Sequence, residues 1–493
     1  MAVVVAVDAG TTGVRSIAVD HEGRPAGASY REFPQHFPRP GWVEHDPDEI
    51  VAAVDATLAE LAGTLDQPVA AVGLTVQRET VVVWDRRTGR PLHRAIVWQD
   101  RRTADRCAAL AEAGHLPLVR EATGLVLDPY FSATKLAWLL TEGGVEASPD
   151  LAAGTVDAWL LWHLTGGAVH ATDPTNASRT LLYDLRTRAW SDELCDVFGV
   201  PAGCLPEVRP TSGRFGVTAA GCPLGAGIPV AGTVGDQQGA LFGQACFEPG
   251  MTKNTYGTGS FVLMNVGPDV PPPVEGLLTT VAWQIGDRTD YALEGAVFVT
   301  GAAIQWLRDG LAVIGSAAEV GPLAESCPDS EGVVVVPAFT GLGSPWWDPY
   351  ARGTVLGITR GTTRAHLARA VVESMAFQTR DVVDAMVAAA GRPVAALRAD
   401  GGASVMDLLL QLQADQLQVP VARPQVQETT AMGAAYLAGL AEGVWSSLDE
   451  VAANWRLDAE FEPKASRAAA DTAHRRWLRG VERARGWEPA GSP

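Results

Sequence analysis

A strand–turn–strand unit that occurs twice, about half the chain apart, constrains the fold most. The first unit has β-rich residues 3–8, the turn Gly10-Thr11-Thr12-Gly13 and β-rich residues 14–20. The second has the turn Tyr256-Gly257-Thr258-Gly259-Ser260, followed by β-rich residues 261–265. Two such units in a chain of 493 residues favour an internal duplication, in which each half builds a sheet around its own glycine-rich turn. Two unrelated hairpins are the alternative.

The other patterns place this duplication in an α/β protein with two domains. Apolar residues at steps of four and seven predict a long helix through residues 367–386, with Thr362 or Thr363 as its N-cap. Residues 69–75, 80–84 and 92–98 are expected to form another antiparallel meander. The turn at 247–250 predicts a boundary between domains 1–246 and 247–493, each with a mixed sheet and with a ligand cleft between them.

Composition excludes several classes of protein. Acidic side chains number 57 against 38 basic ones, and the net charge of −19 argues against nucleic-acid binding through a basic face. No apolar run reaches the roughly 18 residues of a membrane-spanning helix, so we expect no membrane insertion. The six cysteines are scattered without a Cys-x-x-Cys pair, which is typical of free thiols in a reducing cytoplasm.

Three familiar nucleotide-binding patterns are absent from the sequence. There is no Gly-Lys dipeptide for a Walker A loop, no His-Arg-Asp triplet of a protein kinase and no Gly-x-Gly-x-x-Gly fingerprint. A nucleotide would therefore need another phosphate cradle. The two Gly/Thr turns can provide one, because backbone N–H groups and threonine hydroxyls both donate to phosphate oxygens.

Residues beside the turns support this interpretation. Asp8 ends the first strand, where it can hold a magnesium-bound water, and Arg15 on the next strand can add a charged donor. Asp400-Gly401-Gly402-Ala403 places a third glycine-rich turn at a helix start, where the helix dipole favours an anion. Each turn taken alone is also consistent with an ordinary hairpin or β–α connection.

Two polar clusters could act on a small hydroxylated substrate. Gln77-Arg78-Glu79-Thr80 could hold vicinal hydroxyls, with Arg78 donating and Glu79 accepting, although a solvated turn is the simpler interpretation. Gly235-Asp236-Gln237-Gln238 follows the apolar stretch 228–234. A carboxylate at such a strand end is well placed as a general base in phosphoryl transfer, and an N-capping role for Asp236 is the alternative.

From residue 5 to about residue 444, the chain resembles the FGGY carbohydrate kinases. Two stretches, 130–142 around Lys135 and Trp138 and 353–373, fit the signatures of the family. The resemblance also rests on the runs Asp8-Ala9-Gly10-Thr11-Thr12, Pro40-Gly41-Trp42-Val43-Glu44-His45-Asp46-Pro47, Gln77-Arg78-Glu79-Thr80, Ala95-Ile96-Val97-Trp98-Gln99, Asp128-Pro129-Tyr130-Phe131-Ser132, Thr175-Asn176-Ala177-Ser178-Arg179-Thr180, Gly235-Asp236-Gln237-Gln238, Lys253-Asn254-Thr255-Tyr256-Gly257-Thr258-Gly259 and Gly341-Leu342-Gly343-Ser344-Pro345.

The resemblance implies the ribonuclease-H/actin-like ATPase fold, with ATP bound between two related domains. It also implies magnesium-dependent transfer of phosphate from ATP to glycerol, giving sn-glycerol 3-phosphate, in a homodimer or homotetramer. Asp236 matches the catalytic base, and Asp8 and Asp236 match positions near the metal. The positions that match the family's glycerol site are Arg78, Glu79, Trp98, Tyr130, Asp236, Gln237 and Phe261. Those that match its nucleotide site are Thr11, Thr12, Gly13, Arg15, Thr258, Gly301, Gln305 and Gly402.

Departures from the family pattern bear on selectivity and control. Met406 replaces an asparagine that contacts the adenine region, and methionine can pack on a base but cannot donate to it. Segment 221–227 lacks the arginine of a fructose 1,6-bisphosphate site, so we expect no inhibition by that compound. No histidine lies between His170 and His366, so we expect no activation by histidine phosphorylation in this region. Two alternatives stay open: a kinase for another polyol or ketose, and a nucleotide-switched scaffold on the actin/chaperone fold.

Overall fold

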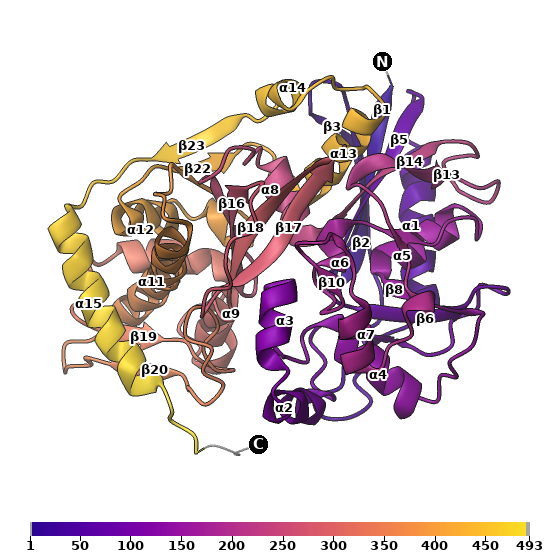
Figure 1. Ribbon diagram of the computed structural model, residues 1–493. Helices are drawn as coiled ribbons and strands as arrows, with labels where there is room; N and C mark the ends of the chain where they lie inside the picture. The colour runs from indigo at the N-terminus through magenta and orange to yellow at the C-terminus, as the bar shows by residue number, and fades with distance from the viewer. Residues whose placement is uncertain (1, 490–493) are drawn as a thin grey trace.

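A computed structural model describes residues 2–489, in which one mixed sheet of 13 strands runs through both halves of the chain (Figure 1). The outermost residues of the two predicted domains, 1 and 490–493, lie outside this range. Along the sheet, the strands of the N-terminal half are β3 (Pro25–Glu32), β2 (Gly13–Val19), β1 (Val3–Ala9), β5 (Val69–Val76), β14 (Pro229–Gly235) and β13 (Ser212–Val217). Those of the C-terminal half follow as β17 (Leu278–Ile285), β18 (Arg288–Val297), β16 (Ser260–Gly267), β15 (Thr252–Tyr256), β21 (Leu397–Asp400), β22 (Val421–Pro424) and β23 (Leu457–Phe461).

The two halves repeat one strand order and one pattern of strand directions. In the N-terminal half, β3, β2 and β1 are successively antiparallel, β5 and β14 continue parallel to β1, and β13 is antiparallel to β14. In the C-terminal half, β18, β16, β15, β21, β22 and β23 have the same directions in the same order. The predicted duplication is therefore confirmed, and the two glycine-rich turns occupy equivalent hairpins.

The meander predicted over residues 69–98 is wrong. β5 lies in the large sheet beside β1, whereas β6 (Val81–Asp85) belongs to a separate sheet with β4 (Glu44–His45), β7 (Ala95–Ile96) and β8 (Leu151–Thr155). The physical reason is that β5 is an apolar strand without alternation, which is typical of a strand buried on both faces of a parallel sheet. The chain between β5 and β6 crosses from one sheet to the other, and it contains Arg78 and Glu79.

Helices cover both faces of the sheet (Figure 1). The longest is α11 (Arg364–Ala390), which begins after the predicted N-cap Thr363. The other helices of the N-terminal half are α1 (Pro47–Ala62), α2 (Ala104–Glu112), α3 (Leu116–Thr123), α4 (Ser132–Thr141), α5 (Val156–Leu164), α6 (Pro174–Ala177), α7 (Asp192–Phe198) and α8 (Asp236–Gly243). Those of the C-terminal half are α9 (Gly301–Gln305), α10 (Val320–Glu325), α12 (Asp407–Leu417), α13 (Thr429–Ala441), α14 (Leu448–Ala453) and α15 (Arg467–Ala484).

Short strand pairs complete the two halves. They are β9 (Ala171–Thr172) with β12 (Glu207–Val208), β10 (Tyr183–Asp184) with β11 (Ala189–Trp190), and β19 (Val334–Val336) with β20 (Thr354–Leu356). Residues 244–251 connect α8 with β15, and the domain boundary that we placed there stays a prediction.

Helix α13 joins the halves, because it belongs to the C-terminal half but packs on β1, β5 and β14 of the N-terminal half. It also lies directly against α8. Glycine permits this approach: a Cβ on Gly433 would lie 1.9 Å from the Gly239 carbonyl oxygen, and one on Gly243 would lie 1.9 Å from that of Thr429. The contact holds α8 where the halves meet, and α8 begins with Asp236.

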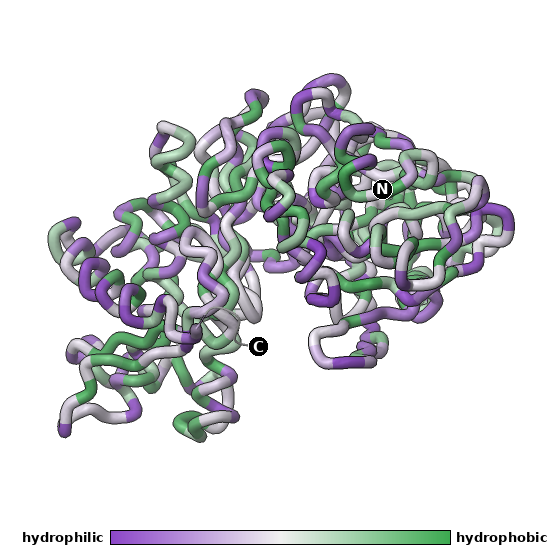
Figure 2. Tube along the Cα trace, turned by 60° about the horizontal axis from the view of Figure 1, so that its bottom comes forward, coloured by the Kyte–Doolittle hydropathy of each residue, from purple (hydrophilic) through white to green (hydrophobic). Residues whose placement is uncertain are grey.

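The described residues also bear on helix hydropathy, on the polarity of the outer loops and on the cysteines. Between residues 2 and 489, no helix is both long and apolar enough to cross a bilayer. Figure 2 shows hydrophilic residues along the outer loops and helices of both halves. All six cysteines are free thiols, as their spacing predicted.

Candidate active site

The carboxyl ends of three neighbouring parallel strands gather the first group of predicted site residues. β1 pairs with β5, and β5 pairs with β14, so that Asp8 near the end of β1 and Asp236 after β14 lie at the same edge of the sheet. The chain leaves β5 at this edge through Gln77. In open α/β sheets this is the edge where ligands bind.

Segment 77–80 is buried, so the interpretation of it as a solvated turn is wrong. Each of its residues is at most 2% exposed. Gln77 receives a hydrogen bond from Thr80 Oγ1 at 2.8 Å and donates to the Gly10 carbonyl at 3.1 Å, which ties the segment to the first glycine-rich turn. Glu79 has a φ of +62°, a conformation that a non-glycine residue rarely adopts and that the surrounding structure must hold in place.

Most of the hydrogen-bond donors of the Arg78 guanidinium are used by other residues of the protein. Its guanidinium donates to both carboxylate oxygens of Glu294, at 2.5 and 3.1 Å, and to Gln238 Oε1 at 3.1 Å. Its Nε lies 3.2 Å from Asp236 Oδ1. One N–H of Nη2 points at the Tyr130 hydroxyl over 3.5 Å, and this loose contact leaves that N–H available for a substrate hydroxyl.

Arg179 and Glu294 complete this buried network, and the sequence-based site did not include them. Arg179 donates to Glu79 Oε1 at 2.7 Å and to Glu294 Oε1 at 2.9 Å. Burial alone would raise the pKa of Glu294, but Arg179 and Arg78 lower it to about 2. Burial raises the pKa of Glu79, against the effect of both arginines. Glu79 Oε2 has no hydrogen-bond partner among the described residues and can accept from a substrate.

Asp236 is the most exposed member of the network, with 28% of its side chain accessible. Its Oδ1 accepts from the Gln237 backbone N–H at 2.7 Å and faces Arg78, whereas its Oδ2 has no partner in the described part of the chain. Burial raises its pKa, and Arg78 opposes that effect. The N-cap of α8 is Gly235, so the capping role considered for Asp236 is wrong. A positioned carboxylate with a raised pKa and a free oxygen suits a general base.

Lys253 orients the neighbouring glutamine. Its ammonium group donates to Gln237 Oε1 at 2.6 Å and to Thr255 Oγ1 at 3.0 Å. Burial lowers the pKa of Lys253 to about 8, in spite of Asp400 and Asp236 nearby. Because Gln237 Oε1 is occupied, the amide NH2 group of Gln237 is left to donate to a ligand.

Two of the three predicted aromatic residues lie together. Trp98 and Tyr130 meet edge to face with ring centroids 5.6 Å apart. Trp98 also donates its indole N–H to Thr11 Oγ1 at 2.9 Å, so this aromatic wall is hydrogen-bonded to the first glycine-rich turn. Phe261 lies on β16 opposite Thr255 and packs on the core that contains Phe242.

The first turn, residues 10–13, closes with a hydrogen bond from Gly10 N–H to the Gly13 carbonyl. Thr12 is exposed. Arg15 lies opposite Asp8 in the hairpin and forms an ion pair with Glu428 across the two halves. Burial, together with Asp236, raises the pKa of Asp8 to about 7. The turn therefore presents a hydroxyl and backbone groups beside a carboxylate that a bound cation would keep ionised.

The second turn, residues 257–259, is in contact with α9. Gly301 donates to the Gly257 carbonyl at 3.1 Å, and a Cβ on Gly301 would lie 2.5 Å from that oxygen. Thr258 is exposed beside the start of the helix, and Gln305 is exposed at its end. The structure thus brings together Thr258 and Gly301, which are far apart in the sequence.

The third turn lies next to the second. Gly401 has a φ of +85°, and a Cβ there would lie 2.5 Å from the Tyr256 carbonyl oxygen, so only glycine fits. Gly402 is exposed and has open space around it. Met406, the N-cap residue of α12, lies 3.3 Å from the Cβ position of Gly321 and is partly buried.

Few residues could hold a metal directly. Within residues 2–489, no cluster of three or more His, Cys, Asp or Glu side chains has the arrangement of a metal site. Asp8 and Asp236 are the two carboxylates at the sheet edge, and two carboxylates with water and phosphate oxygens suit Mg²⁺, which keeps several of its waters. The residues present therefore fit an ion that arrives with a nucleotide.

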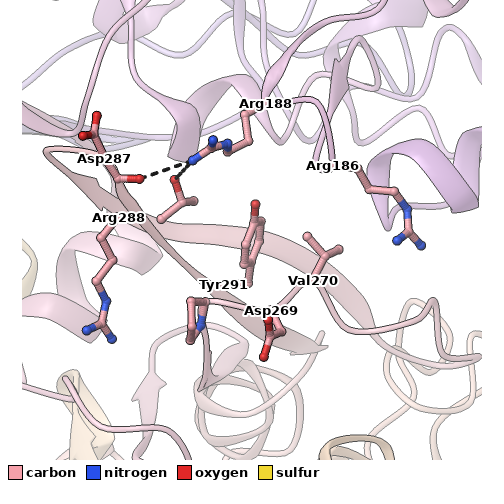
Figure 3. Close-up of a pocket in the computed structure, with 9 residues that line it drawn as sticks. Arg186, Arg188, Asp269, Val270, Asp287, Arg288 and Tyr291 are labelled. Carbon is pink, nitrogen blue, oxygen red and sulfur yellow. Dashed lines mark hydrogen bonds between the residues drawn. The ribbon is translucent and has the colours of Figure 1, made fainter.

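A cavity of about 540 Å³ lies away from these residues (Figure 3). It is lined by the 186–188 turn, residues 268–270 and the 287–291 strand end. Arg186 pairs with Glu121 and Arg288 with Asp290, while Arg188 reaches the Asp287 carbonyl and Thr289. None of the predicted site residues lines this cavity, so it is separate from the candidate active site.

Comparison with known proteins identifies relatives for both halves. The N-terminal domain of the FGGY family of carbohydrate kinases matches residues 3–243, and the C-terminal domain of that family matches residues 252–442. A glycerol kinase of Aromatoleum aromaticum is 54% identical over 99% of this chain and 100% of its own length. A glycerol kinase of Deinococcus radiodurans is 54% identical over 98% of each chain.

Solved structures agree with the fold. The crystal structure of Plasmodium falciparum glycerol kinase with ADP is 34% identical, covers 98% of both chains and superposes with a TM-score of 0.93. A ligand-bound xylulose kinase of Lactobacillus acidophilus, 22% identical with a TM-score of 0.88 over 98% of this chain and 97% of its own, shares the fold.

Proposed function

Because the chain belongs to the FGGY family of carbohydrate kinases, we propose that it transfers the γ-phosphoryl group of ATP to glycerol, giving sn-glycerol 3-phosphate and ADP. Relatives that carry the name glycerol kinase and share 54% of its residues over nearly the whole chain support this substrate. The observation that carries the proposal is the polar set beside Asp236. Its free groups are Asp236 Oδ2, Glu79 Oε2, the Gln237 amide NH2, the Tyr130 hydroxyl and one N–H of Arg78.

This set suits a small triol. Glu79 accepts a hydrogen bond from one hydroxyl, Arg78 and Gln237 donate to hydroxyl oxygens, and Trp98 with Tyr130 packs on the carbon chain. A buried polar group without a partner costs about 1–3 kcal/mol, so substrates that lack a matching hydroxyl are discriminated against.

Asp236 is the general base of the proposed reaction. As the terminal hydroxyl oxygen of glycerol bonds to the γ-phosphorus, its proton passes to Asp236 Oδ2, and the bond from phosphorus to the bridging oxygen of ADP breaks. Arg78 and the Gln237 backbone hold Oδ1 and thereby fix the direction of Oδ2.

The glycine-rich turns are proposed to bind ATP. Thr11, Thr12, Gly13 and Arg15 would contact phosphate oxygens from one half and Thr258 from the other. Gly301, Gln305 and Gly402 would contact the nucleoside. Asp8 and Asp236 would hold Mg²⁺ through water molecules, and the ion would neutralise phosphate charge. Closure of the halves would then exclude water.

One coupled assay tests the proposal. ADP release should depend on glycerol and exceed release with xylulose, erythritol or dihydroxyacetone. Preference for one of those substrates would support the alternative of another polyol or ketose kinase, and slow ATP hydrolysis without any glycerol effect would support a nucleotide-switched scaffold. The family resemblance further supports a cytoplasmic location and a homodimer or homotetramer. Light scattering of the purified protein measures the oligomeric state.

A further inference from the structure

Glu294 connects the C-terminal half to the proposed glycerol pocket. It lies on β18, opposite Leu263 of β16, and its side chain has no solvent-accessible surface. Its two carboxylate oxygens accept three hydrogen bonds, two from Arg78 and one from Arg179. Both arginines belong to the N-terminal half, so the carboxylate of one half determines where two guanidinium groups of the other half lie.

Arg179 carries this connection to Glu79. Its guanidinium is fully buried and lies 5.6 Å from the Tyr130 ring centroid and 5.3 Å from that of Phe131. Its Nε donates to Glu79 Oε1, so that only Oε2 of Glu79 remains free. Glu79 has a left-handed backbone and adjoins no regular element, and this hydrogen bond fixes its side chain.

We propose that Glu294 and Arg179 act through other residues, as positioning residues of the glycerol pocket: Glu294 sets the plane of the Arg78 guanidinium and Arg179 sets the Glu79 carboxylate. The inference rests on the proposed function, because it concerns the same pocket. It adds that the C-terminal half shapes the glycerol pocket through Glu294, in addition to Lys253, which holds Gln237.

Charge and burial support a positioning role over a purely stabilising one. Buried ion pairs recover little net stability, because removing charges from water offsets their attraction. A fork of two parallel N–H donors on one carboxylate does fix orientation, and Arg78 and Glu294 form such a fork. With Arg78 held this way, its Nε faces Asp236 and its remaining Nη2 hydrogen faces Tyr130.

Glu294→Asp and Arg179→Lys test the positioning role. Glu294→Asp keeps the charge but moves the carboxylate back by one methylene, so it should lower kcat/KM for glycerol about tenfold or more while KM for ATP changes less than about twofold. Arg179→Lys should do the same, because lysine cannot reach both carboxylates with a planar fork. Equal kcat/KM values for glycerol in wild type and both variants would overturn the proposal.

A matched control separates positioning from stability. Asp381 on α11 is also buried, with 2% of its side chain exposed, and is held by His474 and Trp477 at 2.6 and 2.8 Å. Asp381→Asn should lower the melting temperature without a selective change in KM for glycerol. If Glu294→Asp also lowers the melting temperature without a selective change in kcat/KM for glycerol, the positioning role is refuted.

Glu294→Gln gives a second readout, because glutamine keeps the length of the side chain but has only one oxygen to accept hydrogen bonds from Arg78 and Arg179. In a folded Glu294→Gln protein, kcat/KM for glycerol should fall while KM for ATP changes less than about twofold, whereas Asp381→Asn should leave the ratio of these two effects unchanged. An unchanged kcat/KM for glycerol in a folded Glu294→Gln protein counts against the proposal, and Glu294→Asp decides the matter if Glu294→Gln does not fold. Wild-type protein without glycerol-dependent ADP release would instead refute the proposed function.

Discussion

Replacement of Asp236 by asparagine is the sharpest test of the proposed chemistry. Asparagine has the same shape, so its Oδ1 can still accept from the Gln237 backbone and face Arg78. Only the free oxygen, Oδ2, becomes an NH2 group that cannot accept a proton. A general base contributes about 10²–10⁴-fold, which corresponds to about 2.7–5.5 kcal/mol of activation free energy. We therefore expect kcat to fall by at least about 10² while KM for glycerol stays within about threefold.

Coupled measurement of ADP release at saturating ATP gives both constants, and thermal melting shows whether the variant is folded. Asp8→Asn is the matched comparison, because Asp8 lies at the same sheet edge but is assigned to the metal. It should raise KM for magnesium-ATP more than KM for glycerol. A folded Asp236→Asn enzyme with near-normal turnover would remove Asp236 from the role of base, and a large rise in KM for glycerol alone would make it a binding residue instead.

Three further predictions follow from single contacts. Since burial raises the pKa of Asp8 from 3.8 to about 7, the folded protein binds more protons than the unfolded chain between these values, so stability from this group declines as pH rises. The melting temperature of Asp8→Asn minus that of wild type should therefore increase from about pH 5 to about pH 8. A difference that stays constant over this range would contradict the reasoning. Gly401→Ala places a Cβ 2.5 Å from the Tyr256 carbonyl at a φ of +85°, so it should cost at least about 1 kcal/mol in unfolding free energy by denaturant titration and weaken ATP binding. Trp98→Phe removes the hydrogen bond to Thr11, worth about 0.5–1.5 kcal/mol, and should raise KM for both substrates several-fold; an effect on glycerol alone would argue against a link between the pocket and the turn.

The elements and turns that depend on local chain properties could be predicted from the sequence. The two hairpins and the long helix after Thr363 follow from apolar periodicity and glycine-rich turns. The pairing of residues 69–98 could not be predicted, because an apolar run indicates a strand buried on both faces but does not identify the strands beside it. β5 and β6 therefore looked like neighbours in one meander, although they lie in different sheets.

The candidate site was predictable only where the chain itself places side chains together. Arg78 and Glu79 are adjacent, and Asp236 follows a strand, so each could be assigned a role from local pattern. Glu294 has no such neighbour: it lies between Leu293 and Gly295 in β18, 216 residues from Arg78. The informative feature would have been its charge, because a carboxylate in a buried part of a strand needs a buried cation as partner.

The duplication explains the two glycine-rich turns, and the differences between the halves explain where the chemistry lies. Asp8 stands two residues before the first turn glycine, Gly10, and the equivalent position before Gly257 is Thr255, which is neutral. Likewise, the residue after β14 is Asp236, whereas the residue after the equivalent strand β22 is Gln425. Both carboxylates that can hold magnesium or take a proton therefore stand in the N-terminal half. We infer that this half directs proton and phosphoryl transfer, and that the C-terminal half, which keeps the turn but lacks these acids, contributes to the same site through nucleotide contacts, Lys253 and Glu294.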